Sequence, residues 1–318
     1  MIINKKHILI VLVLILIKVY MSKCEHFKDT HFYTLEKSIN IMTNPEYFKF
    51  FNDYDFKLRN LNDIDDCIKK YKTNTLEYNK EEKNNLNNLI KKLKSKLTKY
   101  NNVYENVKFI KVNNLLESGL PHTREKAIVF SENWLDTYLN SDFNMFFIRL
   151  ISHEQFHVFQ RYNPKLMEIL YTKYWGMIKF NSLPKELMEI NRTNPDALPD
   201  NFWLFKIEND KYILPLCIYY GNKNSIRDTK NVYFNLFRKN KKLIFTNLKE
   251  EMKNIKLLNE NKSYKDFFGS ESSNNYHPNE LSASLFEILI KDNLENNTTD
   301  NIPALKELDN FLLNEIKN

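Results

Sequence analysis

Apolar residues recur at helical spacing in several segments of the chain. The clearest case lies between Asn79 and Tyr100, where apolar residues alternate with a lysine-rich outer face: Leu86, Leu89, Ile90, Leu93 and Leu97. An apolar stripe under a charged surface is typical of an amphipathic helix packed on a core. Similar spacing predicts further helices over these segments: 165–180, 231–260, 278–291 and 303–316.

Shorter runs rich in β-branched and aromatic residues favour strands. They are NVKFIKV at 106–112, KAIVFS at 126–131 and YILPLCIYYG at 212–221. Pro215 lacks a backbone N–H, which predicts an edge position for the third strand. The stretch between 183 and 203 is punctuated by Pro and Asn and is expected to be mostly loop. The predicted fold class is α+β and mostly helical.

One predicted helix is apolar on nearly every side. It begins at Ser141 and ends where Asn163 precedes Pro164. Such a helix belongs in the core, yet its SHEQFHVF segment carries two histidines and a glutamate: His153, Glu154 and His157. Buried imidazoles and carboxylates are costly unless something binds them. We therefore expect these residues to form a site.

The spacing of the two histidines is suited to a metal ion. Residues i and i+4 lie on one helix face, so His153 and His157 can direct their imidazoles to one point, as a zinc ion requires. Glu154 lies on the flank, where its carboxylate can reach a metal-bound water. The segment therefore predicts a zinc site with an adjacent general base.

Zinc needs a third protein ligand. A third histidine six residues after His157 is excluded, because that position is Asn163. The segment YHPNELSASLFE instead places Glu280 in the first turn of a predicted helix that begins at Pro278. Glu280 is the preferred third ligand. Other residues that could replace it or support the site are Glu287, Asp266, His277 and Ser284.

HEQFH at 153–157 followed by NELSA at 279–283 resembles the gluzincin type of zinc metallopeptidase. The resemblance implies one Zn²⁺ bound by His153, His157 and Glu280, with Glu154 activating water for peptide-bond hydrolysis. It also implies a zincin-like fold, in which a small mixed sheet with an edge strand packs on the buried HExxH helix, and 126–131 stands where that edge strand would be. The family often has an acidic residue at the position of Ser284.

A donor for the oxyanion is also needed in such a mechanism. The candidates in the sequence are His122, Tyr276, His277 and Arg192, with His122 and Tyr276 preferred. The alternatives to a peptidase are a zincin-fold binding protein that holds zinc without proteolysis, and a structural protein in which HExxH is accidental. The expected partner of the enzyme is a peptide or protein substrate.

Composition and charge exclude some functions. The net charge of +7 comes from 47 basic and 40 acidic residues spread along the chain, and no nucleic-acid-binding motif occurs, so no nucleic-acid partner is expected. The cysteines Cys24, Cys67 and Cys217 form no CxxC pair. Cys67 and Cys217 could form one disulfide or remain buried thiols.

The N-terminus predicts export. Lys5 and Lys6 precede an apolar run from Ile8 to Ile17, which is the arrangement of a secretory signal peptide or a signal anchor. We expect a secreted or membrane-anchored protein located outside the cytoplasm, with membrane contact only through this segment if it is not cleaved. The predicted organisation is therefore a signal at 1–23, an N-terminal helical region at 24–105 and a catalytic domain at 106–318, with an insertion between 165 and 270.

Overall fold

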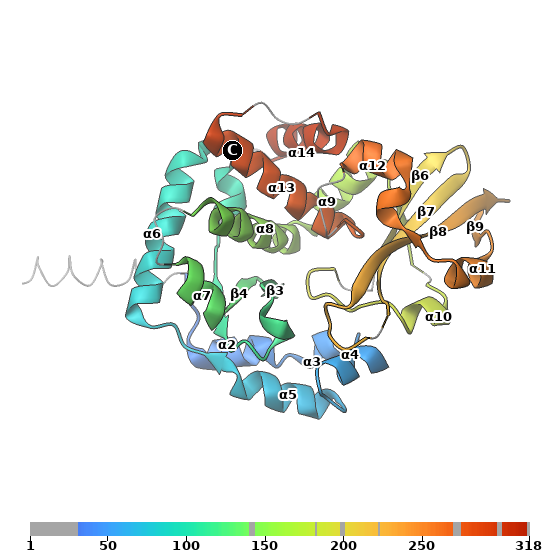
Figure 1. The fold of residues 1–318 in the computed structure, drawn as a ribbon. Helices are drawn as coiled ribbons and strands as arrows, with labels where there is room; N and C mark the ends of the chain where they lie inside the picture. Colours follow the sequence, from blue (N-terminus) through green and yellow to red (C-terminus); the bar gives the residue numbers. More distant parts are fainter. Residues whose placement is uncertain are drawn as a thin grey trace, which may run out of the picture.

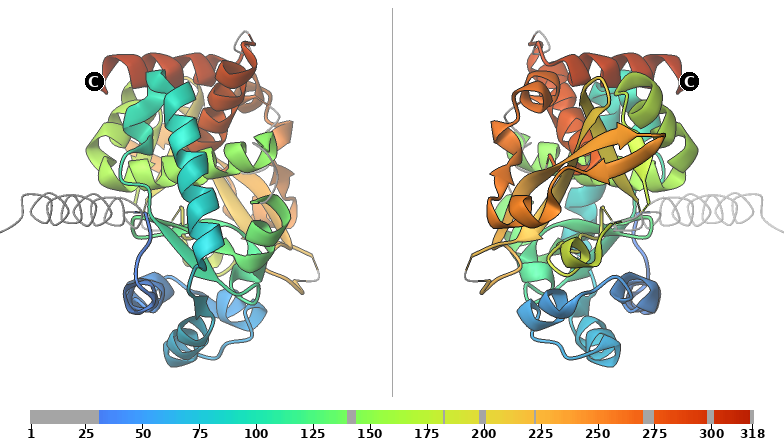
Figure 2. Two further views of the ribbon diagram at one scale, coloured as in Figure 1. Left: turned by 90° about the vertical axis from the view of Figure 1, so that its left-hand side faces the viewer. Right: turned by 90° about the vertical axis from the view of Figure 1, so that its right-hand side faces the viewer.

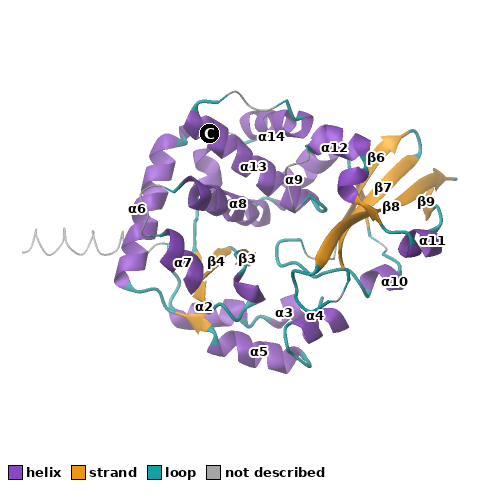
Figure 3. Ribbon diagram, in the orientation of Figure 1, coloured by secondary structure: helices purple, strands orange, loops and turns teal. Residues whose placement is uncertain are grey.

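The computed structural model describes most of the chain after the predicted signal. The described ranges are 31–139, 144–181, 183–197, 201–221, 223–269, 275–297 and 301–316. The signal at 1–23 and Ser141 lie outside the described residues. Helices and two sheets form a mixed α+β structure, which confirms the coarse fold class (Figure 3). No helix in these ranges combines the length and apolar character needed to cross a bilayer.

The N-terminal region is helical, as the sequence predicts. Its helices are α2 (Leu35–Met42), α3 (Pro45–Phe48), α4 (Asp53–Leu58), α5 (Ile64–Thr73) and α6 (Lys80–Lys96), followed by a 3-10 segment, η1 (Thr98–Tyr104). Helix α6 begins with a capping box, because the side chains of Asn79 and Glu82 each accept a hydrogen bond from the other's backbone N–H. Three residues of the predicted stripe, Leu86, Ile90 and Leu93, are buried on one face of this helix, Leu89 is partly buried, and Leu97 follows the helix as its C-cap.

The small sheet has the strand order β1-β2-β4-β3. Its strands are β1 (Thr75–Leu76), β2 (Phe109–Val112), β3 (His122–Arg124) and β4 (Ala127–Ser131), and only β2 and β4 are parallel. The expectation that 126–131 forms the edge was wrong, since β4 lies between β2 and β3. Glu125, with φ of 46°, turns the chain between them, so β3 folds back along β4 and becomes the edge.

The buried helix forms as predicted, as α8 (Met145–Tyr162). The side chain of Asn144 caps its N-terminus, and it ends at Asn163 before Pro164. Helix α13 (Pro278–Glu295) packs against it, and α14 (Pro303–Asn314) lies beyond α13 (Figure 1). Phe156 on α8 stacks on Phe286 on α13, with ring centroids 4.8 Å apart. The two helices predicted to carry the metal ligands are therefore direct neighbours.

The predicted helix over 231–260 was wrong for most of its length. Residues Thr229–Lys239 and Lys242–Phe245 form an antiparallel hairpin, β8 and β9, and the short helix α11 covers only Leu248–Lys253. The buried residues of β8 alternate, because Val232, Phe234 and Leu236 point to one face of the sheet. Asn240 and Lys241 make the turn with positive φ, the backbone geometry of a tight hairpin.

This hairpin belongs to a second, larger sheet in the order β10-β8-β7-β6-β5. The remaining strands are β5 (Ile178–Phe180), β6 (Phe202–Glu208), β7 (Lys211–Tyr219) and β10 (Lys256–Leu257). Strand β7 is central, which corrects the edge position inferred from Pro215. The last residue of β7 that pairs with β6 is Ile213, so the missing N–H of Pro215 interrupts no ladder on that side.

Short helices complete the fold. The segment predicted as a helix over 165–180 is α9 (Pro164–Ile169) continued by one π-helical turn (Leu170–Tyr174), after which the chain enters β5. The others are α7 (Glu132–Tyr138), α10 (Lys185–Met188) and α12 (Lys262–Phe268). Figure 2 shows that α6 runs across one side of the molecule while the larger sheet lies on the opposite side.

Cys67 and Cys217 are buried free thiols rather than a disulfide.

Candidate metal centre

Two helices bring the three predicted ligands to one point. On α8, the Nε2 atoms of His153 and His157 lie 3.2 Å apart. Oε2 of Glu280, in the first turn of α13, lies 3.5 Å from Nε2 of His153 and 3.7 Å from Nε2 of His157. The exposed fractions are 8% for His153, 1% for His157 and 2% for Glu280, so the cluster is screened from bulk water.

The spacing of these atoms fits a zinc ion. Tetrahedral ligands at about 2.0–2.1 Å from zinc are separated from one another by about 3.3 Å, which is close to the three separations in the cluster. Oε2 of Glu280 is buried and has no hydrogen bond, so it has a lone pair to offer. Two imidazole nitrogens and one carboxylate oxygen are a donor set that zinc commonly binds, with a fourth position left for water or substrate.

A glutamine that sequence analysis did not single out orients His157. Oε1 of Gln160 lies 2.9 Å from Nδ1 of His157, and Nε2 of Gln160 donates to the backbone oxygen of Asn279 and to Oγ of Ser282, both at 2.8 Å. Because the amide nitrogen serves those two acceptors, Oε1 must accept from Nδ1–H. The lone pair of His157 therefore lies on Nε2, the atom that faces His153 and Glu280.

Glu287 lies next to Nδ1 of His153, as Gln160 lies next to Nδ1 of His157. Its Oε2 lies 3.5 Å from Nδ1 of His153, and Arg149 holds the same carboxylate at 2.5 Å. Burial opposes protonation of His153, but Glu280 and Glu287 raise its pKa well above the ordinary value. The carboxylates of Glu280 and Glu287 thus lie on opposite sides of this imidazole, and their negative charge would favour a bound cation.

The other oxygen of Glu280 is fixed by an asparagine. Nδ2 of Asn194 donates to Oε1 of Glu280 at 2.5 Å and to the hydroxyl of Tyr276 at 2.7 Å. Asn194 was not among the residues predicted from the sequence, where its only signal is the NPD tripeptide in a segment expected to be loop. With Oε1 held in this way, Oε2 is the oxygen turned toward the histidines.

Glu154 lines a cavity of about 250 Å³ together with two of the predicted ligands, His153 and Glu280. Its exposed fraction is 4%, and its Oε2 atom has no hydrogen bond. Burial and the nearby Asp196 carboxylate raise the pKa of Glu154 to about 8. A divalent cation bound by the adjacent histidines would lower this pKa, because it favours the charged carboxylate. The position and charge of Glu154 suit proton transfer to and from a water molecule in this cavity.

His122 also lines the cavity, as an acceptor rather than as a donor. Its Nδ1 lies 2.9 Å from the backbone oxygen of Leu120, which only accepts, so Nδ1 carries the proton. Burial and Arg124 lower the pKa of His122 to about 4, which leaves the ring neutral at pH 7. Its buried Nε2 has no partner and presents a lone pair. In this tautomer His122 cannot donate to an oxyanion.

The other oxyanion candidates lie in different surroundings. Tyr276 is not among the residues that line this cavity, and its hydroxyl accepts a hydrogen bond from Asn194. His277 accepts from the backbone N–H of Asn279 through Nδ1, so its Nε2–H donates to the backbone oxygen of Asn201. Neither His277 nor Asp266 belongs to the ligand cluster found among the described residues. Arg192 lines the cavity, and its Nε atom has no hydrogen bond there.

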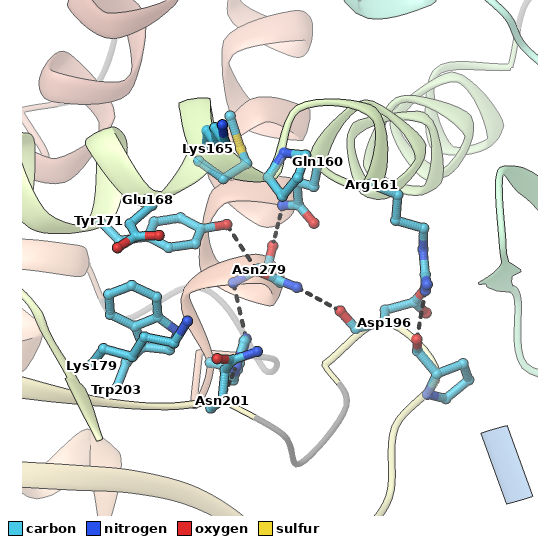
Figure 4. Close-up of a pocket in the computed structure, with 14 residues that line it drawn as sticks. Gln160, Arg161, Lys165, Glu168, Tyr171, Lys179, Asp196, Asn201, Trp203 and Asn279 are labelled. Carbon is cyan, nitrogen blue, oxygen red and sulfur yellow. Dashed lines mark hydrogen bonds and ion pairs between the residues drawn. The ribbon is translucent and has the colours of Figure 1, made fainter. Parts of the chain in front are cut away.

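A second cavity, of about 310 Å³, adjoins the first and shares Pro195 and Asp196 with it. Figure 4 shows Asn279 between the groups that hold it. The Tyr171 hydroxyl donates to Oδ1 of Asn279 at 2.9 Å, and Nδ2 of Asn279 donates to the backbone oxygen of Asp196 at 3.0 Å. The start of α13 is thereby tied to the loop that separates the two cavities.

Comparison with known proteins adds no relative: no family model, curated protein or solved structure matches the chain.

Proposed function

We propose that this chain is a zinc-dependent peptidase of the gluzincin type, with one Zn²⁺ held by His153, His157 and Glu280. The observation that carries the proposal is the convergence of three buried ligand atoms at separations of 3.2 to 3.7 Å. A buried carboxylate, Glu154, lines the same cavity as His153 and Glu280. The packing of α8 between the small mixed sheet and α13 supports a zincin-like fold.

When bound, zinc would lower the pKa of a coordinated water and polarise the carbonyl of the scissile bond. Glu154 accepts one proton from the attacking water as the water oxygen bonds to the carbonyl carbon. It then delivers that proton to the leaving nitrogen as the C–N bond breaks. Gln160 and Glu287 keep the imidazole lone pairs on the ligand side, and Asn194 does the same for Glu280.

The decisive experiment combines zinc quantification with a Glu154→Gln variant. Purified wild-type protein is expected to contain about one zinc per chain and to cleave members of a mixed peptide library. The variant should retain zinc and lose most of the activity, because the amide cannot accept a proton. Protein purified without metal would contradict both zinc functions. If wild type and variant hold zinc and are equally inert, the alternative of a zinc-binding, non-proteolytic protein replaces the peptidase.

The third ligand can be tested by two matched substitutions on α13. Glu280→Ala is expected to abolish tight zinc binding, because it removes a ligand. Glu287→Ala should weaken binding only about 10–100-fold, the usual effect of losing a group that orients a ligand. Zinc dissociation constants measured by competition with a chelator separate the two. The reverse order of effects would make Glu287 the ligand.

A further inference from the structure

Arg192 differs from the other buried or half-buried arginines of the described chain. Each of the others forms an ion pair with a carboxylate: Arg59 with Asp55 and Glu117, Arg124 with Glu117, Arg149 with Glu287, and Arg161 with Asp196. Within the described residues, no carboxylate lies within ion-pair distance of Arg192. Arg192 is half-buried, and its Nε atom is buried without a hydrogen bond. Removing part of a guanidinium from water without a counter-charge is costly. The arrangement therefore favours an anionic ligand.

The backbone around Arg192 is fixed by the end of β7. The N–H of Arg192 donates to the backbone oxygen of Cys217 at 2.9 Å, and that of Tyr219 donates to the backbone oxygen of Ile190 at 2.9 Å. Asn52 donates to the backbone oxygen of Asn191 at 2.7 Å. These hydrogen bonds hold in place the backbone from which the Arg192 side chain extends.

The cavity that Arg192 lines also contains His153, Glu154 and Glu280, so an anion bound to Arg192 would lie close to the reacting bond. At about 250 Å³ the cavity is smaller than the roughly 300–1,000 Å³ that small-molecule sites usually have. A space of this size suits the end of a peptide better than the middle of an extended chain. The anion found at one end of every unmodified peptide is the C-terminal carboxylate.

We propose that Arg192 binds the free α-carboxylate of the substrate, so that the protein acts as a carboxypeptidase and releases the C-terminal residue. This inference rests on the proposed peptidase function. The planar guanidinium can bind a carboxylate through two parallel hydrogen bonds, which fixes its orientation as well as its charge. The water oxygen bonds to the last peptide carbonyl carbon and the C–N bond breaks. The proton taken by Glu154 passes to the amino group of the departing amino acid.

Two readouts test this inference on the zinc-loaded, full-length protein. The first compares cleavage of an N-acetylated dipeptide that has a free C-terminal carboxylate with cleavage of the same dipeptide as its C-terminal amide. Wild type should prefer the free acid by about 10–100-fold in kcat/KM, which is the effect expected from one charge-assisted hydrogen-bonded pair. Arg192→Met should lose most of this preference through a higher KM, and Arg192→Lys should recover part of it. Arg238→Met, which removes an exposed cation on β8, should behave as wild type.

The second readout does not need hydrolysis. In a Glu154→Gln background, N-acetylphenylalanine should bind by calorimetry about 10–100-fold more tightly than its amide, and adding Arg192→Met should remove the difference. Zinc content and the thermal unfolding midpoint of each variant show whether it is folded. Equal use of acid and amide by wild type, or equal loss of both in Arg192→Met, would refute the inference while leaving a peptidase. Arg192-dependent carboxylate binding without any cleavage by the wild type would retain Arg192 as a carboxylate site, but it would refute both the carboxypeptidase activity and the proposed function.

Discussion

At the scale of single residues, hydrogen bonds determine which atom each ligand presents. His157 is held through Gln160, and Gln160 is itself held by the backbone of Asn279 and the hydroxyl of Ser282 on α13. One amide therefore links a ligand on α8 to the helix that carries the third ligand. Its loss should affect the metal centre more than the fold.

We expect Gln160→Leu to weaken zinc binding about 10–100-fold, because His157 loses the acceptor that fixes its tautomer. The measurement is a zinc dissociation constant obtained by competition with a chelator. Gln155→Leu is the matched control on the same helix, since Gln155 donates to the backbone oxygen of Val103 at 2.7 Å and lies away from the ligands. The control should lower the unfolding midpoint with little change in zinc affinity. Equal zinc affinity in both variants would show that Gln160 has no orienting role.

The sequence predicted some residues of the site better than others, for a physical reason. His153, Glu154 and His157 were identifiable because one helix fixes their relative positions by spacing alone. Glu280 needed only the start of a second helix at Pro278. The roles of Gln160, Asn194 and Arg192 depend on which groups of distant segments they meet, and on which nitrogen of an imidazole carries a proton. The spacing of residues along the sequence indicates neither the contacts between distant segments nor the protonated nitrogen of a histidine.

At the scale of elements, the segments with one clear periodicity were predicted correctly. Helices α6, α8 and α13 formed because their apolar positions, caps and prolines all favour the same structure. The prediction at 231–260 was wrong because the apolar residues there are separated by lysines and asparagines, and their spacing is compatible with a helix as well as with a strand. Residues 229–239 form a strand because they pair with the neighbouring strand β7. The local sequence pattern also could not predict that β3 is an edge strand and that β7 is a central strand, because strand order depends on contacts between distant segments.

The contact between α8 and α13 should depend on one aromatic residue. Phe286 is fully buried and meets the rings of Phe156, Tyr100 and Tyr104, so it joins α13 to α8 and to η1. Phe286→Ala should lower the free energy of unfolding by about 3–5 kcal/mol, because it leaves a cavity among these rings. Leu313→Ala is the apolar control, since Leu313 is 51% exposed, and should change it by less than about 0.5 kcal/mol. Denaturant titration measures both, and similar values for the two would contradict the packing argument.

At the scale of the whole molecule, a buried charge network joins the N-terminal helices to the cavity wall. Arg59, the C-cap residue of α4, pairs with Glu117 at 2.8 Å and with Asp55 at 2.9 Å. Arg124 on β3 pairs with Glu117 at 3.2 Å. Tyr47 and Tyr71 also donate to Glu117. Glu117 lines the same cavity as His153 and Glu280, so the N-terminal region contributes to the shape of the site.

Arg59→Met should destabilise the protein by about 3–5 kcal/mol near neutral pH, because it leaves Glu117 and Asp55 short of a counter-charge. Burial raises the pKa of Glu117, but Arg59 and Arg124 outweigh it and hold the pKa far below the ordinary value. A lowered pKa contributes stability that is complete above the unfolded value of about 4.3 and declines as pH falls toward the folded value. The difference between wild type and variant in urea titrations should therefore shrink below about pH 4. A difference independent of pH would show that Glu117 is not the group affected.

The hydrophobic core leads to a prediction about the N-terminal region as a whole. Leu86, Ile90 and Leu93 of α6 belong to the same core cluster as Phe130 of β4 and Phe147 of α8. Strand β1 also pairs with β2, and Lys111 on β2 forms an ion pair with Glu82 on α6 at 2.7 Å. A chain that begins after the exposed turn at 105–106 would leave this apolar surface open to water.

We therefore expect residues 106–318, expressed alone, to lack a cooperative unfolding transition and to bind zinc weakly. The separate fragment 31–105, added in equimolar amount, should restore both properties, because the two pieces rebuild one core. Calorimetry and chelator competition measure these effects, with the intact chain as the reference. If residues 31–105 were a removable propeptide, the opposite would hold. The shorter chain would then unfold near the wild-type midpoint and bind zinc with wild-type affinity, and the added fragment would inhibit it rather than repair it.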